Sequence, residues 1–124
     1  MMPQEAKELM APMLKKELFV VLRKPADLSR FNEFLAEHLR WAIKAEQRGE
    51  LFASGPFLDE DAEPGEAGGM SIFRGASKRE VRQLLADDPF IKNGVYTADV
   101  KKWLLMEGGL TVTLRFSDKS YLLR

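Results

Sequence analysis

The sequence predicts one α+β domain, in which two strand–helix–strand units form an antiparallel sheet with helices on one face. Three observations predict this class. Short runs of β-branched and aromatic residues alternate with two amphipathic segments. A stretch of acidic residues, glycine and proline, from about 57 to 68, separates the two units. The 124 residues are enough for one hydrophobic core and too few for two.

The first unit begins after a short N-terminal segment, in which residues near Gln4 to Leu14 could form a helix. The run ELFVVLRKP then predicts a strand that ends at Pro25. From residues 26 to 49, apolar side chains recur at intervals of three and four, which predicts a long amphipathic helix closed by Gly49. The run LFASGP predicts the second strand.

The second unit begins with GMSIFRGA, which predicts the third strand. Ser77 is followed three residues later by Glu80, a capping-box arrangement that opens a helix. The alternating run GVYTADVKKWLLM predicts the fourth strand. Two such units in succession form the ferredoxin-like split β-α-β pattern. Because this pattern leaves one sheet face without helices, we expect a homodimer that packs sheet to sheet, or a higher oligomer built on it.

The two ends of the chain lie outside this pattern. We expect residues 1–16 to form an N-terminal extension, residues 17–106 the ferredoxin-like domain, and residues 107–124 an added β-hairpin. LTVTLRF and YLLR are strand-like, and SDKS between them can form the turn.

Composition restricts the function classes. The chain has 19 basic and 19 acidic residues, so no overall field attracts a nucleic acid or an anionic membrane. It has no cysteine, which excludes a disulfide framework and a thiolate nucleophile and is typical of a reducing cytoplasm. No secretory signal pattern and no apolar run of about 18 residues is visible. We therefore expect a cytoplasmic protein whose partners are a small molecule and a second copy of itself.

His38 is the only histidine, and it lies on the apolar stripe of the first predicted helix, between Leu35 and Ala42. A buried imidazole needs hydrogen-bond partners, so a structural role in the core is one interpretation. The other is general acid/base chemistry, with Asp88 orienting the ring. Asp88 precedes Pro89, however, and this pair is also the ordinary start of a helix.

Ser54, Gly55 and Pro56 end the second predicted strand. They could simply terminate it, or Gly55 could let the backbone approach a ligand. The acidic residues of the following loop do not have the spacing of a calcium-binding EF-hand, and no second histidine is available for a transition metal. No phosphate-binding glycine loop is present. We therefore expect neither a metal site nor a cofactor.

Taken together, four stretches resemble the YCII-related family of small dimeric α+β barrel proteins. The resemblance covers about residues 17 to 104 and leaves out both ends of the chain. The stretches that carry it are EHLRW, RGELFASGPF, GGMSIFRGAS and DDPFIKNGVY.

The resemblance implies a ferredoxin-like fold whose sheets pair in a dimer, with a pocket between helices and sheet in each subunit. It also implies an active-site pair, which would be His38 and Asp88 here. The wider superfamily includes muconolactone isomerases, cofactor-free monooxygenases and haem-binding enzymes, so the fold alone does not fix the chemistry.

Two hypotheses follow. The first is a cofactor-independent enzyme that acts on a small cyclic or aromatic molecule by isomerisation, elimination or proton transfer, with His38 and Asp88 as the acid/base pair. Ser54, Gly55 and Pro56 would contact the ligand. The alternative is a non-catalytic dimeric module for ligand binding or interaction, in which His38 and Asp88 only hold the pocket together.

Overall fold

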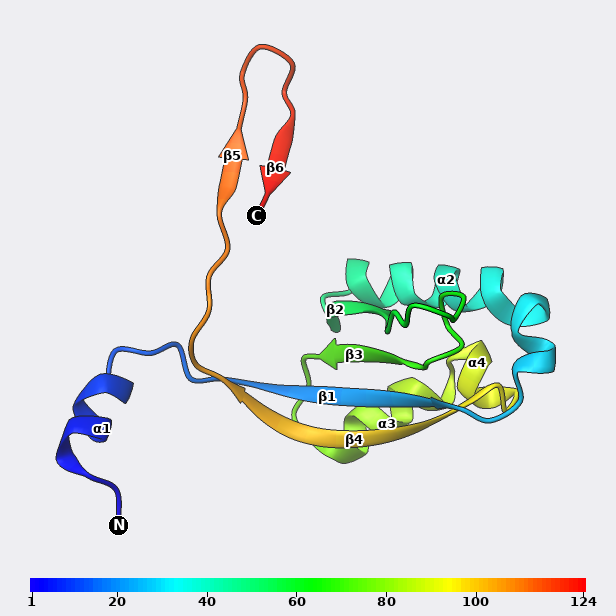
Figure 1. Ribbon diagram of the computed structural model, residues 1–124, viewed down its shortest axis with the longest axis horizontal. Helices are drawn as coiled ribbons and strands as arrows, with labels where there is room; N and C mark the ends of the chain where they lie inside the picture. The colour runs from blue at the N-terminus through cyan, green and yellow to red at the C-terminus, as the bar shows by residue number, and fades with distance from the viewer. The chain divides into compact units, whose positions relative to one another are not determined.

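The computed structural model describes residues 1–124, which form two compact units (Figure 1). The larger unit comprises Glu17–Leu104, and the smaller comprises Met1–Lys16 with Leu105–Arg124. No helix in the chain is both long enough and apolar enough to cross a membrane.

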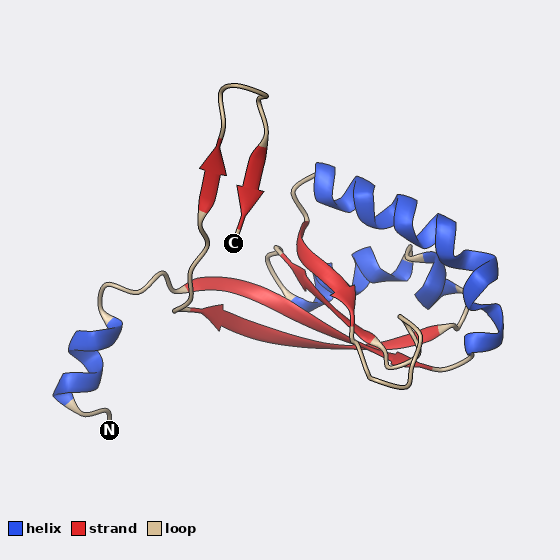
Figure 2. Ribbon diagram, turned by 45° about the horizontal axis from the view of Figure 1, so that its top comes forward, coloured by secondary structure: helices blue, strands red, loops and turns tan.

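The larger unit contains a four-stranded antiparallel sheet in the order β2-β3-β1-β4, with its helices on one face (Figure 2). This arrangement confirms the predicted ferredoxin-like α+β class. The sheet consists of β1 (Lys16–Pro25), β2 (Leu51–Pro56), β3 (Gly69–Phe73) and β4 (Tyr96–Leu105).

The helix signals in the sequence correspond to the observed helix starts. A single turn η1 (Leu28–Arg30) leads into α2 (Phe31–Gln47), and α3 (Lys78–Ala86) begins after Ser77. The Ser77 hydroxyl accepts the backbone N–H of Glu80 at 3.1 Å. The Glu80 carboxylate accepts the N–H of Ala76, one residue before the position that an ideal capping box uses.

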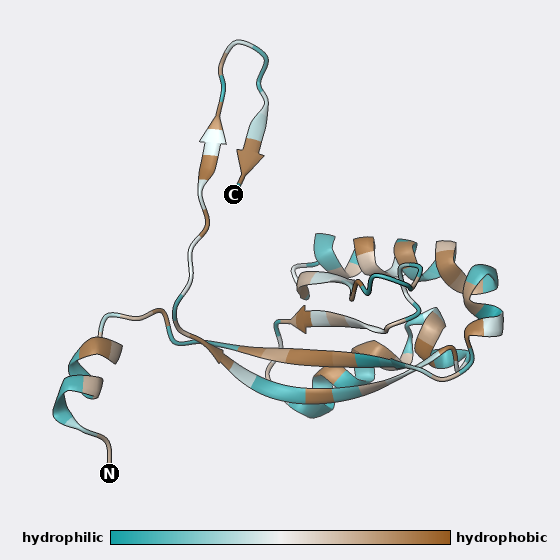
Figure 3. Ribbon diagram, in the orientation of Figure 1, coloured by the Kyte–Doolittle hydropathy of each residue, from teal (hydrophilic) through white to brown (hydrophobic).

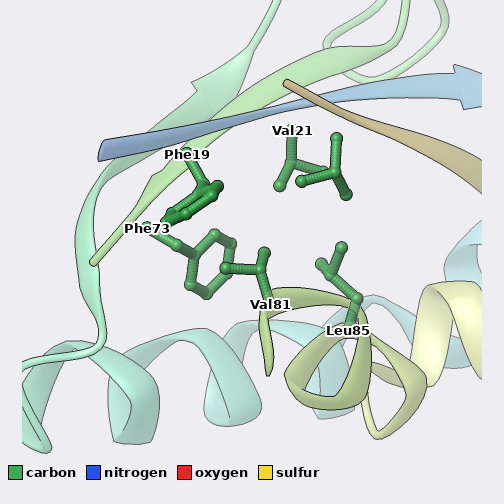
Figure 4. Close-up of a cluster of buried hydrophobic side chains, with 6 residues drawn as sticks. Phe19, Val21, Phe73, Val81 and Leu85 are labelled. Atoms are coloured by element: carbon green, nitrogen blue, oxygen red, sulfur yellow. The ribbon is translucent and has the colours of Figure 1, made fainter. Parts of the chain in front are cut away.

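One of two buried hydrophobic clusters lies between the sheet and α3. Phe19 and Val21 of β1 and Phe73 of β3 point toward Val81 and Leu85 of α3 (Figure 4). Figure 3 shows the apolar middle of β1 and the alternation of apolar and polar residues along α2.

The strand register extends this core face to a charged residue. Phe19 pairs with Phe73, Val21 with Ser71 and Arg23 with Gly69. Since side chains alternate along a strand, Arg23 points to the same face as Phe19 and Val21. Arg23 and Ser71 are both buried. The helix-covered face of the sheet therefore carries two buried polar side chains next to its apolar residues.

The smaller unit contains a helix and a hairpin. The helix α1 (Gln4–Met10) has no buried residue and ends before Pro12, so it is shorter than the segment to Leu14 that the sequence allowed. Strands β5 (Val112–Leu114) and β6 (Tyr121–Leu123) pair as an antiparallel hairpin, which confirms the predicted C-terminal hairpin.

Candidate active site

Asp88 is the centre of a buried polar network. It is the N-cap of the one-turn helix α4 (Pro89–Lys92), where its Oδ1 accepts the backbone N–H of Phe90 at 3.0 Å. The same Oδ1 lies 2.7 Å from Nδ1 of His38, and Oδ2 accepts a hydrogen bond from Nη1 of Arg23. One carboxylate thus joins α2, β1 and the start of α4.

The network continues along the sheet. Nε of Arg23 donates to the Ser71 hydroxyl at 3.0 Å, and Ser71 shares a hydrogen bond of 2.8 Å with the Ser54 hydroxyl. Since β2 pairs with β3, Ser54 lies directly beside Ser71 in the register. The polar chain therefore runs from His38 through Asp88, Arg23 and Ser71 to Ser54.

The charge on Asp88 is maintained by its neighbours. Burial, with 0% of the side chain exposed, would by itself raise the pKa of the carboxyl group. The hydrogen bond with His38 and the positive charge of Arg23 outweigh this effect and hold the pKa below its ordinary value. Asp88 is accordingly an anion at neutral pH.

The imidazole of His38 has one engaged and one unengaged nitrogen. Its ring stacks on Phe90, with 4.3 Å between the ring centroids and 19° between the planes. Nδ1 is held by Asp88, whereas Nε2 has no hydrogen bond to the protein. Because an ionised carboxylate only accepts, Nδ1 carries a proton and the lone pair of neutral His38 lies on Nε2. Nε2 is therefore the atom that can take up or return a proton.

A cavity of about 450 Å³ lies against this network, between α2, β2 and the loop that follows β2. Its polar lining side chains are Arg23, His38, Glu46, Ser54 and Tyr96, and its other lining side chains are apolar. Leu39, Ile43 and Phe52 are exposed lining residues, so the cavity opens to solvent beside them. Its apolar side chains are Phe31, Leu35, Leu39, Ala42, Ile43, Leu51, Phe52, Ala53, Pro56, Pro64 and Phe90.

The residues singled out in the sequence lie in two layers of this site. His38, Ser54, Gly55 and Pro56 line the cavity, whereas Asp88 is sealed behind His38 and Arg23 and does not line it. His38 and Asp88 are in direct contact, as the family resemblance implies. Nowhere in the chain do three or more His, Cys, Asp or Glu side chains come close enough to hold a metal ion.

Arg23 and Ser71 were not predicted as site residues from the sequence. A usable signal was present for Arg23, because strand alternation places it in phase with Phe19 and Val21. No comparable signal marks Ser71, whose importance depends on its neighbours across the sheet.

Tyr96 fixes one wall of the cavity, a role that was not predicted from the sequence either. Its hydroxyl donates to the backbone carbonyl of Gly65, which ties the loop after β2 to the sheet. Burial raises the pKa of Tyr96, and the charge of Arg23 opposes part of that rise. Tyr96 is thus a neutral donor that holds the loop in place.

The comparisons with known proteins agree with this fold. Residues 18–104 match the YCII-related domain. The chain belongs to the YCII-related family. This match confirms the resemblance seen in the sequence and covers all of the sheet's core-forming residues. A comparison with curated proteins finds no match.

One solved structure similar to this family member is 5-chloro-2-hydroxyhydroquinone dehydrochlorinase from Burkholderia phenoliruptrix AC1100, in complex with 2,5-dihydroxybenzoquinone. The two chains are 25% identical and superpose with a TM-score of 0.59. The similarity covers 69% of this chain and 92% of the dehydrochlorinase chain.

Proposed function

We propose that this protein is a cofactor-independent enzyme that moves protons on a small hydroxylated cyclic or aromatic molecule, with elimination of a halide as its reaction class. The observation that carries the proposal is the position of His38. Its ring forms part of the cavity wall, its Nδ1 is held by a buried carboxylate, and its Nε2 is left for a ligand. Such a histidine is equipped for general acid/base catalysis.

Each site residue has a role in this proposal. His38 is the acid/base group, and Asp88 orients the ring and stabilises its protonated form. Ser54, Gly55 and Pro56 form the wall that β2 presents to the ligand. The apolar lining would hold a flat ring, because ligand sites are mostly apolar with a few placed polar groups.

The similar dehydrochlorinase supports this reaction class. Loss of hydrogen chloride from a chlorinated hydroxyhydroquinone needs no external oxidant, because the departing chloride takes the electron pair that the ring gives up. A hydroxyl proton is first moved to the ring carbon that bears chlorine. A second hydroxyl proton is then removed as chloride leaves and the quinone forms. Both steps require only a group that accepts and returns protons.

The test is chloride release from 5-chloro-2-hydroxyhydroquinone and its halogenated relatives, with quinone formation followed by absorbance. We expect one chloride per quinone from the wild type and a rate lower by about 100-fold or more from His38→Asn, which loses the acid/base group. Gln83→Asn, an exposed change on α3, is the control and should keep the wild-type rate.

Two outcomes would contradict the proposal. Retention of the wild-type rate by folded His38→Asn would remove His38 as the acid/base group. Stabilisation of the wild type by 2,5-dihydroxybenzoquinone in a thermal-shift assay, without turnover of any halogenated hydroquinone, would favour the alternative of a ligand-binding module.

A homodimer packed sheet to sheet is part of the proposal. On the sheet face opposite Phe19 and Val21, the paired residues are Val20 with Ile72 and Leu22 with Met70. These four apolar side chains are half-buried or exposed, so a second copy would remove them from water. The cytoplasmic location stays a prediction from the sequence.

A further inference from the structure

Arg23 has hydrogen-bonding capacity that the protein does not use. A guanidinium group carries five N–H donors and no acceptor. Nε donates to Ser71 and Nη1 donates to Asp88, which leaves three N–H groups without an acceptor. Buried arginines normally have partners for their donors, since each unsatisfied donor is costly.

Nη2, which carries two of the unused N–H groups, remains accessible, and Arg23 lines the cavity. Arg23 is only 7% exposed, yet it lines the cavity. No side-chain nitrogen or oxygen that is fully sealed from solvent lacks a hydrogen-bond partner, so Nη2 is not sealed. The Trp41 ring lies 6.0 Å from the guanidinium carbon. The structure thus presents a cationic N–H donor group to a ligand in the cavity.

The charges of Arg23, Asp88 and His38 suit a reaction in which the ligand gives a proton to His38 and becomes negative. Before a proton moves, Arg23 and Asp88 compensate one another's charge. When Nε2 of His38 takes a proton, the imidazolium is stabilised by Asp88. The negative charge left on the ligand then needs a separate partner, and the same Asp88 holds Arg23 beside the same cavity.

We propose that Arg23 binds the substrate oxygen on which negative charge develops, which makes Arg23 a further catalytic residue. The proposal rests on the proposed function and names its substrate class: a neutral cyclic phenol or enolisable ketone. In the step concerned, an O–H or C–H bond of the substrate breaks and an N–H bond forms at Nε2. The electron pair is left on a phenolate or enolate oxygen beside Arg23.

The cavity favours a ligand that enters neutral and becomes charged there. Glu46 also lines the cavity and would repel a permanent carboxylate. Most of the remaining lining is apolar, which penalises a charged ligand until it reaches a donor. A phenol therefore meets these conditions better than a benzoate does.

The test uses 4-nitrophenol, whose ionised form absorbs in the visible range, bound over a series of pH values. We expect the wild type to bind the ionised form at a pH where the free probe is mostly neutral, and to bind 4-nitroanisole and 4-nitrobenzoate more weakly. Arg23→Lys keeps the charge beside Asp88 but loses the planar donor fork. It should bind the ionised probe about 10- to 100-fold more weakly. Arg82→Lys, an exposed change on α3, is the matched control.

His38→Asn removes the imidazole and keeps Arg23. It therefore shows which of the two cationic groups binds the ionised probe, even if Arg23→Lys does not fold. Without an imidazolium, the preference for the ionised probe should persist, because Arg23 carries it. Loss of that preference in His38→Asn would overturn the proposal, as would an unchanged preference in folded Arg23→Lys. Equal wild-type binding of 4-nitrophenol and 4-nitroanisole would also overturn it.

The binding assay is independent of turnover. If no halide is released but the ionised probe binds as described, the elimination reaction fails and the role of Arg23 as an anion-binding group stands. If halide is released and folded Arg23→Lys binds the ionised probe like the wild type, the inference about Arg23 fails alone.

Discussion

Asp88 has three partners in the folded chain, and each belongs to a different part of the structure. It caps α4 through Phe90, orients His38 and neutralises Arg23. A residue with these contacts contributes to stability whether or not the site is catalytic. Stability measurements on Asp88 therefore test the network itself, separately from the proposed reaction.

Asp88→Asn should destabilise the protein by about 3–5 kcal/mol, because it leaves the buried Arg23 charge uncompensated. Urea unfolding at neutral pH measures this loss. The neighbouring Asp87 is exposed, so Asp87→Asn makes the same chemical change outside the network and should stay within about 0.5 kcal/mol of the wild type. Equal effects of the two changes would show that the ion pair contributes little.

The pH dependence of stability should carry the signature of Asp88. Its pKa in the folded state lies below the ordinary 3.8, so the unfolded chain takes up a proton first as the pH falls. The stabilisation is complete above about pH 5 and is lost as the pH falls through 3.8 and on through the folded pKa. Between about pH 5 and pH 3, the unfolding free energy of the wild type should fall more steeply than that of Asp88→Asn. Parallel curves would contradict this assignment.

At the scale of elements, the loop after β2 is held to the domain at Gly65. Gly65 has φ +98°, and a Cβ there would lie 2.7 Å from Cε2 of Phe31 and 3.0 Å from the Tyr96 hydroxyl oxygen. The loop therefore approaches α2 and β4 more closely than any residue with a side chain allows. Since Pro64, Gly65 and Gly68 line the cavity, this approach also sets the shape of its wall.

Gly65→Ala should lower the unfolding free energy by more than Gly49→Ala does. Gly49 has a similar φ of +80° but no atom within 4 Å of an added Cβ. Gly49→Ala should therefore show only the backbone cost, about 1–2 kcal/mol, and Gly65→Ala a further 1–3 kcal/mol or so from overpacking. Thermal or urea unfolding of the pair measures the difference, and equal losses would mean that the loop moves away freely.

At the scale of the whole molecule, the open sheet face determines the proposed assembly. Ile72→Glu places a charge among the apolar residues of that face and should convert the proposed dimer into a monomer, because a buried unpaired charge costs several kcal/mol. Sedimentation velocity measures the change. Gln83→Glu adds the same charge on α3 and should leave the proposed dimer intact. Dimerisation of Ile72→Glu would show that another surface forms the interface.

Local patterns predicted most of the fold. The 3.6-residue period of α2, the Ser77 cap of α3 and the Asp88–Pro89 start of α4 all depend on residues close together in the chain. The ferredoxin-like topology followed from their order. The end of α1 at Met10 was less well predicted, because that helix has no buried residue and so no packing signal.

The sequence by itself determined the order of the elements, the apolar face of each one and the presence of a single imidazole on such a face. Asp88 was named from the sequence as one hypothesis for the partner of this imidazole, and the tertiary structure decided that the two side chains meet. Only the tertiary structure decided that an arginine 65 residues from this carboxylate meets it too. Hydrophobic periodicity assigns a residue to a face but does not say which residue of another element it touches. That choice depends on strand register and on how the helices pack over the sheet, and these two features place Arg23, His38 and Asp88 together.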